Sequence, residues 1–383
     1  MEKQIFSLIL ITLGVFVIPF LSPFLRIPVA VGELLYGMVL VPLMDKADLE
    51  VINFLSFLGF SLLMFLAGLE IDWNKLETLK AREKLVIALV VASNFLLAGL
   101  AVKVLKLSVE AVLILGALGI GLMLSVLREL KISPYFKQIV LITGSLGEVI
   151  TLLGLTVYDL HLTFGWSSSF YLYLALIGLF GLFFVFLLKV INLLVWYYPT
   201  QVASLIAEET KAAVDIRASF ALMLLFMAFT SFIHVEPILG AFIAGTLLGF
   251  IFREKKQFEA KLSSFGYGFL IPFFFVQVGF SFDFSSLSVL FLQLSVVILV
   301  AIFVIKVLSS AWFKLLGFST KEILLAGLLF SFPFTVLIAI GKILHEKGVW
   351  DSSNFALIVL ITVISSILFP VAVKFLSSKE SSA

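Results

Sequence analysis

The sequence has no cysteine and only three histidines, His161, His234 and His345, among its 383 residues. The lack of cysteine excludes a disulfide framework, a thiolate metal site and a thiol nucleophile. Because the histidines are scattered over predicted loops and helix ends, we expect no metal cluster. Charged residues are scarce as well, at 13% of the chain, and the net charge of +2 gives no reason to expect a nucleic-acid partner.

Sequence signatures of enzymes and of cofactor-binding proteins are also missing. The chain contains no phosphate-binding glycine-rich loop, no HExxH zinc motif, no nucleophile elbow and no GxGxxG dinucleotide motif. We therefore expect a protein that is not an enzyme and that binds no cofactor.

Hydrophobic residues, by contrast, make up 62% of the chain and include 42 phenylalanines. They occur in long runs rather than in alternation, which is typical of helices that cross a bilayer. We predict an all-α polytopic membrane protein that is embedded in a lipid bilayer and has about 13 transmembrane helices. The predicted spans are 4–20, 28–42, 52–70, 85–105, 109–127, 138–158, 168–190, 217–233, 237–252, 268–283, 287–312, 321–341 and 354–376.

The distribution of positive charge predicts the orientation of these helices. If the N-terminus lies outside, most of the 26 lysines and arginines fall in cytoplasmic loops. We predict a multi-pass protein of the cytoplasmic (inner) membrane, with the N-terminus outside and the C-terminus in the cytoplasm. The longest loop, 197–217, contains ASLIAEETKAAVDIR, which predicts a cytoplasmic amphipathic helix. With helix 7 as connector, this loop divides the chain into two six-helix halves.

The two halves resemble each other in sequence. Four landmarks of the first half recur in the second at an offset of about 210 residues: Gly32-x4-Gly37 with Gly240-x4-Gly245, GLEID (68–72) with GFSFD (279–283), KVLKLS (103–108) with KLLGFS (314–319), and Gly116 with Gly327. Because the copies are seven helices apart, they have opposite orientations in the membrane. This inverted repeat is typical of secondary transporters that work by alternating access.

The segment Ile139–Tyr158 contains a single charged residue, Glu148, near its middle. A helix of this length spans about 30 Å, the thickness of a bilayer's hydrocarbon core, so Glu148 is predicted near the membrane centre. An ionised carboxylate there costs at least about 2.5 kcal/mol. We expect it to be neutral part of the time, paired or next to a wet cavity, and to bind and release a cation as it exchanges a proton.

Helices 5 and 12 carry matching interruptions. Helix 5 contains Gly116, Gly119 and Gly121, whereas helix 12 contains Gly327 and the stretch SFPFT, which includes Ser331, Pro333 and Thr335. Proline removes a backbone donor and frees a carbonyl, and broken membrane helices offer such carbonyls and their half-helix dipoles to ions. The alternative is that the glycines only allow close helix packing.

Other polar residues lie close to Glu148 on the predicted helix. Gly144, Ser145 and Thr151 share a face with it, and hydroxyl oxygens beside a carboxylate suit a small hard cation. The alternative is that each hydroxyl hydrogen-bonds its own helix backbone. Lys306 in helix 11 is either a partner of Glu148 or a side chain that extends to the interface. Acids near helix ends, such as Glu33, are expected to be solvated or to line entrances.

With these features in place, the chain resembles the monovalent cation:proton antiporters, in particular the sodium/hydrogen and potassium/proton exchangers with thirteen helices. The similarity runs from about residue 4 to residue 376 and rests on four segments together. These segments are VGELLYGMVLVP (31–42), FLGFSLLMFLAGLEID (57–72), VEPILGAFIAGTLLGF (235–250) and IPFFFVQVGFSFD (271–283).

The resemblance implies a transport core in which helices 5 and 12 are broken and cross, and a scaffold that forms a homodimer. It implies that Gly147 and Glu148 stand where the family carries an acidic, Asn-Asp or Gln-Asp pair, and that Lys306 is the family's basic residue of helix 11. The implied divisions are 1–72 (scaffold helices 1–3), 85–160 (core helices 4–6), 168–198 (linker helix 7), 199–283 (amphipathic segment and scaffold helices 8–10), 287–376 (core helices 11–13) and 377–383 (cytoplasmic tail).

We therefore expect a secondary active transporter that exchanges Na⁺ or K⁺ for protons, in which Lys306 pairs with Glu148 when no cation is bound. No other metal is expected. The site has fewer oxygen ligands than the family pattern, because Gly147 has no side chain and helices 5 and 12 read GALGIGLMLSV and SFPFTV. Two alternatives thus remain open: a proton-coupled transporter of an anion or small acid on the same fold, and a non-transporting sensor or structural member.

Overall fold

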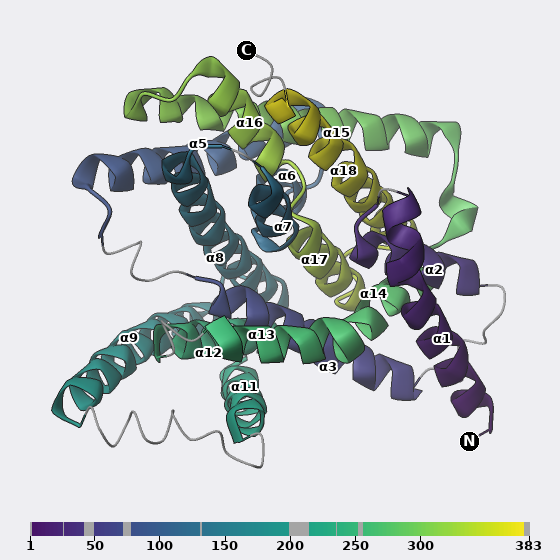
Figure 1. Ribbon diagram of the computed structural model, residues 1–383, viewed down its shortest axis with the longest axis horizontal. Coiled ribbons are helices and arrows are strands. Elements are labelled where there is room, and N and C mark those ends of the chain that lie inside the picture. Colours follow the sequence, from purple (N-terminus) through teal and green to yellow (C-terminus); the bar gives the residue numbers. More distant parts are fainter. Residues whose placement is uncertain are drawn as a thin grey trace. The chain divides into compact units, whose positions relative to one another are not determined.

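The computed structural model describes residues 2–25, 27–41, 50–71, 78–130, 132–198, 214–234, 236–251 and 256–378, and this part of the chain is helical without a β-strand. The helices are α1 (Glu2–Leu25), α2 (Val29–Leu40), α3 (Glu50–Leu69), α5 (Ala81–Leu105), α6 (Ala111–Gly116), α7 (Gly121–Glu129), α8 (Pro134–Phe164), α9 (Ser168–Tyr197), α11 (Val214–Phe232), α12 (Pro237–Ile251), α13 (Lys256–Phe265), α14 (Ile271–Phe280), α15 (Val289–Ser310), α16 (Thr320–Phe330), α17 (Phe334–Glu346) and α18 (Ser352–Ser378) (Figure 1).

Each of the thirteen predicted spans coincides with a helix or with a pair of half-helices. Within the described ranges, nine helices are long and apolar enough to cross a membrane, and four shorter apolar helices account for the remaining spans. The prediction of a multi-pass helical membrane protein is confirmed. Residues 203–213 of the predicted amphipathic helix lie outside the described residues, and its last four residues form the start of α11.

The largest error in the predicted boundaries concerns the span 268–283. The structure begins this helical stretch at Lys256, and α13 continues through a π-helical turn, η2 (Gly266–Leu270), into α14. Hydrophobicity could not indicate α13, because KQFEAKLSSF is polar and has no continuous apolar face long enough to resemble a span. The helical stretch is therefore longer than its apolar part.

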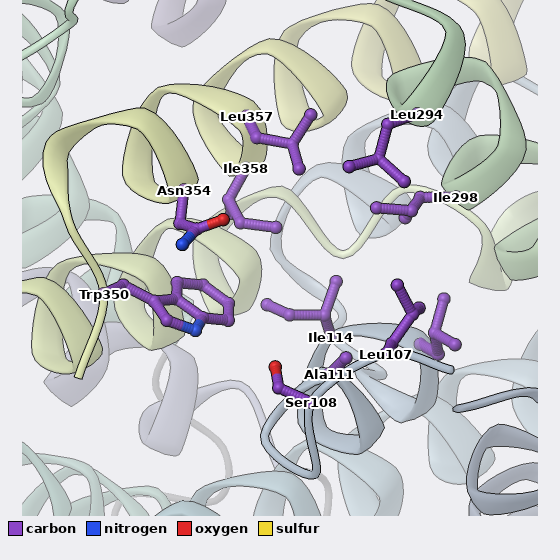
Figure 2. A pocket seen from close by; sticks show the side chains of 11 residues that line it. Leu107, Ser108, Ala111, Ile114, Leu294, Ile298, Trp350, Asn354, Leu357 and Ile358 are labelled. Carbon is purple, nitrogen blue, oxygen red and sulfur yellow. The ribbon is translucent and has the colours of Figure 1, made fainter. Parts of the chain in front are cut away.

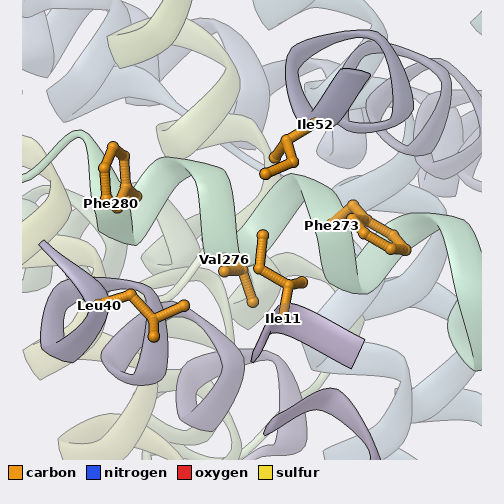
Figure 3. Packing of buried hydrophobic residues seen from close by; sticks show 6 residues of the cluster. All are labelled: Ile11, Leu40, Ile52, Phe273, Val276 and Phe280. Carbon is orange, nitrogen blue, oxygen red and sulfur yellow. The ribbon is translucent and has the colours of Figure 1, made fainter. Parts of the chain in front are cut away.

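The helices form two compact units. The first consists of residues 1–56, 78–152 and 272–383, and the second of residues 57–77 and 153–271. In the first unit, a cluster of buried side chains joins α1, α2 and the first turn of α3 to α14 (Figure 3). Its members are Ile11, Leu40, Ile52, Phe273, Val276 and Phe280. Glu33 on α2 is also buried, with 4% of its surface exposed, so a solvated position is wrong, and its alternative, a place at an entrance, stays a prediction.

In the first unit, glycines bring α2 and α14 into backbone contact. A Cβ atom on Gly37 would overlap the carbonyl oxygen of Val276, and one on Gly279 would overlap the carbonyl oxygen of Leu34. Small residues let membrane helices approach closely enough for backbones to touch, and this packing replaces the hydrophobic drive that lipid does not supply. The two helices are therefore held by reciprocal glycine contacts.

The second unit contains the equivalent contact between α12 and α3. There Gly245 faces the carbonyl oxygen of Phe65, and Gly68 faces the carbonyl oxygen of Phe242. Each glycine and each carbonyl is separated from its counterpart in the first unit by the offset of the sequence repeat. The same reciprocal contact thus occurs twice, as the predicted repeat requires.

Replacing Gly37 by Ala is expected to lower the free energy of unfolding by about 1–3 kcal/mol, because the added methyl group must displace the backbone of α14. Gly99→Ala is the matched control, since a Cβ atom at this helical position meets nothing within 4 Å. Thermal unfolding in detergent measures both. Equal melting temperatures for the two variants would contradict the proposed tight contact.

Candidate functional site

Two broken helices lie at the centre of the candidate site, at the positions predicted from the sequence. The first break, residues 117–120, separates α6 from α7, and the second, residues 331–333, separates α16 from α17. Ala117 leaves the helical conformation with φ −51° and ψ 131°, and Pro333 does so with φ −74° and ψ 65°. Pro333 cannot donate a backbone hydrogen bond, so the helix cannot pass through it unchanged.

The two breaks pack against each other, and α6 and α7 lie beside α17 in Figure 1. A Cβ atom on Gly119 would lie 3.3 Å from the Cβ atom of Pro333. One on Gly121 would lie 3.5 Å from the hydroxyl oxygen of Thr335. The structure therefore brings together four of the residues that the sequence analysis assigned to the site.

Glu148 on α8 lies directly against the first break. Its side chain is 1% exposed, and its Oε2 atom accepts a hydrogen bond of 3.0 Å from the backbone N–H of Ile120. Ile120 is the residue that precedes α7, so the carboxylate faces the N-terminal, positive end of a half-helix dipole. Its Oε1 atom has no hydrogen-bond partner among the described residues. One carboxylate oxygen is therefore held, and the other is buried without a hydrogen-bond partner in the described part of the chain.

Close approach of α8 to the first break depends on two glycines. A Cβ atom on Gly144 would come within 2.8 Å of the side chain of Ile120, and one on Gly147 would overlap the side chain of Leu118. The absence of a side chain at Gly147, next to Glu148, thus has a packing reason. Larger residues at these positions would push the break away from the carboxylate.

The hydroxyl groups near Glu148 bond mainly to backbone. Thr151 donates to the carbonyl of Gly147 at 2.7 Å and accepts a 3.4 Å hydrogen bond from the N–H of Leu118 in the break. Ser145 donates to Leu141, and Ser331 donates to Gly327, each within its own helix. Ser145 and Thr151 therefore both bond to their own helix backbone, as in the stated alternative, and Thr151 also helps to hold the break.

Lys306 on α15 is fully buried, with 0% of its surface exposed, so it does not extend to the protein surface. Its Nζ atom donates a hydrogen bond of 2.8 Å to the side-chain oxygen of Asn94. The structure shows no ion pair between Lys306 and Glu148, although both residues belong to the described part. The predicted pairing is thus not present in this conformation.

Asn94 on α5 is the polar residue that the sequence analysis missed. It is fully buried, and its side-chain amide donates a 2.6 Å hydrogen bond to the carbonyl of Gly116, the last residue of α6. A signal was available, because a side-chain amide within an apolar span is costly unless it has partners. The same argument that identified Glu148 could have drawn attention to Asn94.

A small cavity of about 80 Å³ lies next to the start of α6 (Figure 2). Its walls are mainly apolar and come from α6, α15 and α18, with polar atoms from Ser108, Trp350 and Asn354. Glu148 and Lys306 are not among its lining residues. The cavity therefore leaves space beside the first half of the broken helix but does not include the candidate ion site.

Comparison with known proteins supports the resemblance found in the sequence. The family model described as the transmembrane sodium/hydrogen exchanger matches residues 9–379. YjbQ of Bacillus subtilis strain 168, provisionally named a Na⁺/H⁺ antiporter, is 27% identical over 96% of this chain. The chain spans 62% of that relative's length. A protein of Enterococcus hirae named a Na⁺/H⁺ antiporter is 26% identical, and the match covers 92% of each chain.

A solved structure shows the same fold. The sodium proton antiporter MjNhaP1 of Methanocaldococcus jannaschii, at pH 8, superposes with a TM-score of 0.68 at 17% sequence identity. The superposition covers 99% of this chain and 98% of the other. The overall helical fold of this chain is thus one already observed in a solved structure.

Proposed function

Because this chain belongs to the transmembrane sodium/hydrogen exchanger family, we propose that it exchanges Na⁺ or K⁺ for protons across a membrane by alternating access. Relatives whose names describe Na⁺/H⁺ antiporters support this function. We further propose that the chain is a homodimer in the cytoplasmic membrane, with its C-terminus in the cytoplasm. The bias of lysine and arginine toward one set of loops supports that orientation.

The observation that carries the proposal is the geometry of Glu148. A buried carboxylate with one oxygen held by the Ile120 N–H, and the other without a hydrogen-bond partner among the described residues, can bind either a proton or a small cation, but not both together. Hard monovalent cations prefer oxygen ligands, and the carbonyls of a broken helix can supplement the carboxylate. Competition for Glu148 would couple the two fluxes.

The same geometry explains why the two ions exchange rather than leak. With neither ligand bound, Glu148 is an ionised carboxylate in an apolar barrier, and its transfer to the other side is energetically costly. A bound proton or a bound cation neutralises the carboxylate, so only the occupied forms change conformation readily. Each crossing therefore carries one ligand in, and the return carries the other out.

The direct test is ion exchange in liposomes that contain the purified full-length protein. With a pH gradient imposed, addition of Na⁺ or K⁺ is expected to dissipate the gradient, whereas addition of choline at the same ionic strength is not. A pH-sensitive dye reports the movement, and the cation with the lower half-maximal concentration is the preferred substrate. If neither cation moves protons while the protein is folded, the exchange proposal is wrong; a response to anions instead would favour a proton-coupled anion transporter.

A further inference from the structure

The two candidate coupling residues, both in the described part of the chain, form no ion pair with each other, but both are linked to the same break. The break of residues 117–120 begins after Gly116, whose carbonyl accepts from Asn94, and ends at Ile120, whose N–H donates to Glu148. Asn94 in turn accepts from Lys306. A continuous path of hydrogen bonds and of the four backbone residues between α6 and α7 therefore joins Lys306 to Glu148.

Each end of this path is fully enclosed. Asn94 and Lys306 are 0% exposed and Glu148 is 1% exposed, so water does not compete for these bonds at the protein surface. Both polar atoms of the Asn94 side-chain amide are hydrogen-bonded: its nitrogen donates to the carbonyl of Gly116, and its oxygen accepts from Lys306. Removing one partner of a buried hydrogen bond leaves the other partner unsatisfied, so the three groups act as a unit.

We propose that Asn94 is a positioning residue for cation binding, which fixes the first break between Lys306 and Glu148. The proposal rests on the proposed exchange function but concerns a residue that does not contact the ion. Asn94 holds the carbonyl end of α6, and this fixes the backbone amide that orients Glu148 at the opposite end of the break. Because the side-chain oxygen of Asn94 accepts from Lys306, the position of Lys306 on α15 also influences the geometry of the Glu148 carboxylate.

The test measures cation binding without turnover, through the rise in melting temperature of the purified full-length protein with increasing NaCl or KCl. Choline chloride keeps the ionic strength constant. In Asn94→Leu, which has a similar volume and no polar atoms, the concentration for half-maximal stabilisation is expected to rise at least about tenfold. Asn53→Leu is the matched control, because it removes the bond to Gln277, which involves α3 and α14 and not the break. Its half-maximal concentration is expected to stay within about twofold of the wild type.

A double-mutant cycle separates positioning from general stabilisation. If Asn94 acts together with Lys306, Asn94→Leu is expected to shift the half-maximal concentration by less than about threefold in a Lys306→Met background, which has no donor for the oxygen of Asn94. Equal shifts in the two backgrounds, or no shift in the wild-type background, would overturn the proposal. If the wild type responds to neither cation, the exchange function is overturned as well. If the wild type responds but Asn94→Leu shows no shift, only the role of Asn94 is overturned.

A second variant covers the case in which Asn94→Leu does not fold. Asn94→Asp keeps an acceptor for Lys306, but an ionised carboxylate has no N–H for the carbonyl of Gly116. Its half-maximal concentration is expected to rise as well, because one end of the bridge is broken. Wild-type cation dependence in Asn94→Asp would show that the bond to the break is unnecessary and would refute the proposed role.

Discussion

Glu148→Gln is expected to abolish cation-dependent proton movement, with a loss of at least about a hundredfold in the initial rate. Glutamine has nearly the same shape, and its oxygen can still accept from the N–H of Ile120, so the break keeps its position. The glutamine side chain carries no charge and exchanges no proton between acidic and alkaline pH, so neither the cation nor the proton binds. The measurement is dissipation of a pH gradient in liposomes by Na⁺ or K⁺.

The matched control for this variant is Glu33→Gln on α2. Glu33 is a second buried carboxyl, with 4% of its surface exposed, and it lies on a helix that is not broken. We expect exchange to continue in Glu33→Gln at a rate within about threefold of the wild type. Retained exchange in Glu148→Gln, with folded protein in the vesicles, would remove Glu148 from the mechanism.

Lys306→Gln is expected to separate function from stability. The buried nitrogen of Lys306 is hydrogen-bonded to a neutral amide and not to a carboxylate, so no opposite charge offsets its desolvation. Glutamine removes this cost, and its N–H₂ group can replace the donor to Asn94. We therefore expect the melting temperature to rise by a few degrees, while the exchange rate falls at least about tenfold.

Two controls make this result interpretable. Lys342→Gln removes another poorly exposed lysine, which lies on α17 near Glu346, and is expected to leave exchange within about threefold of the wild type. Lys306→Arg keeps a positive charge and donors but changes their geometry. A Lys306→Gln variant that is both less stable and fully active would contradict the functional role of Lys306.

The sequence contains strong signals for the features that depend on composition and local backbone chemistry. Long apolar runs locate the spans, and the isolated charge of Glu148 identifies the candidate carboxylate. The breaks near Gly119 and Pro333 were also predictable, because glycine and proline at matching positions of a repeat disturb a helix locally. None of these features requires knowledge of which helices are neighbours.

The features that could not be predicted depend on tertiary contacts. The partner of Lys306 lies on a helix more than two hundred residues away, and an amide attracts less notice in a sequence than an opposite charge. Glu33 was expected in water or at an entrance because it lies near a helix end, yet the surrounding helices bury it. The polar helix α13 carries no apolar run, so only the structure shows that the helical stretch begins at Lys256.

The neutral partner of Lys306 has a consequence for the electrical properties of the proposed cycle. Asn94 carries no charge, and its bond to Lys306 does not involve Glu148. In the proposed cycle we expect Lys306 to keep this partner and its charge whether Glu148 holds a cation or a proton, so that the two loaded forms carry the same net charge. Moving one elementary charge through a potential of 100 mV involves about 2.3 kcal/mol, but the outward and return contributions cancel when the charges are equal. The chemical gradients alone would then set the direction of a one-for-one exchange, at any membrane voltage.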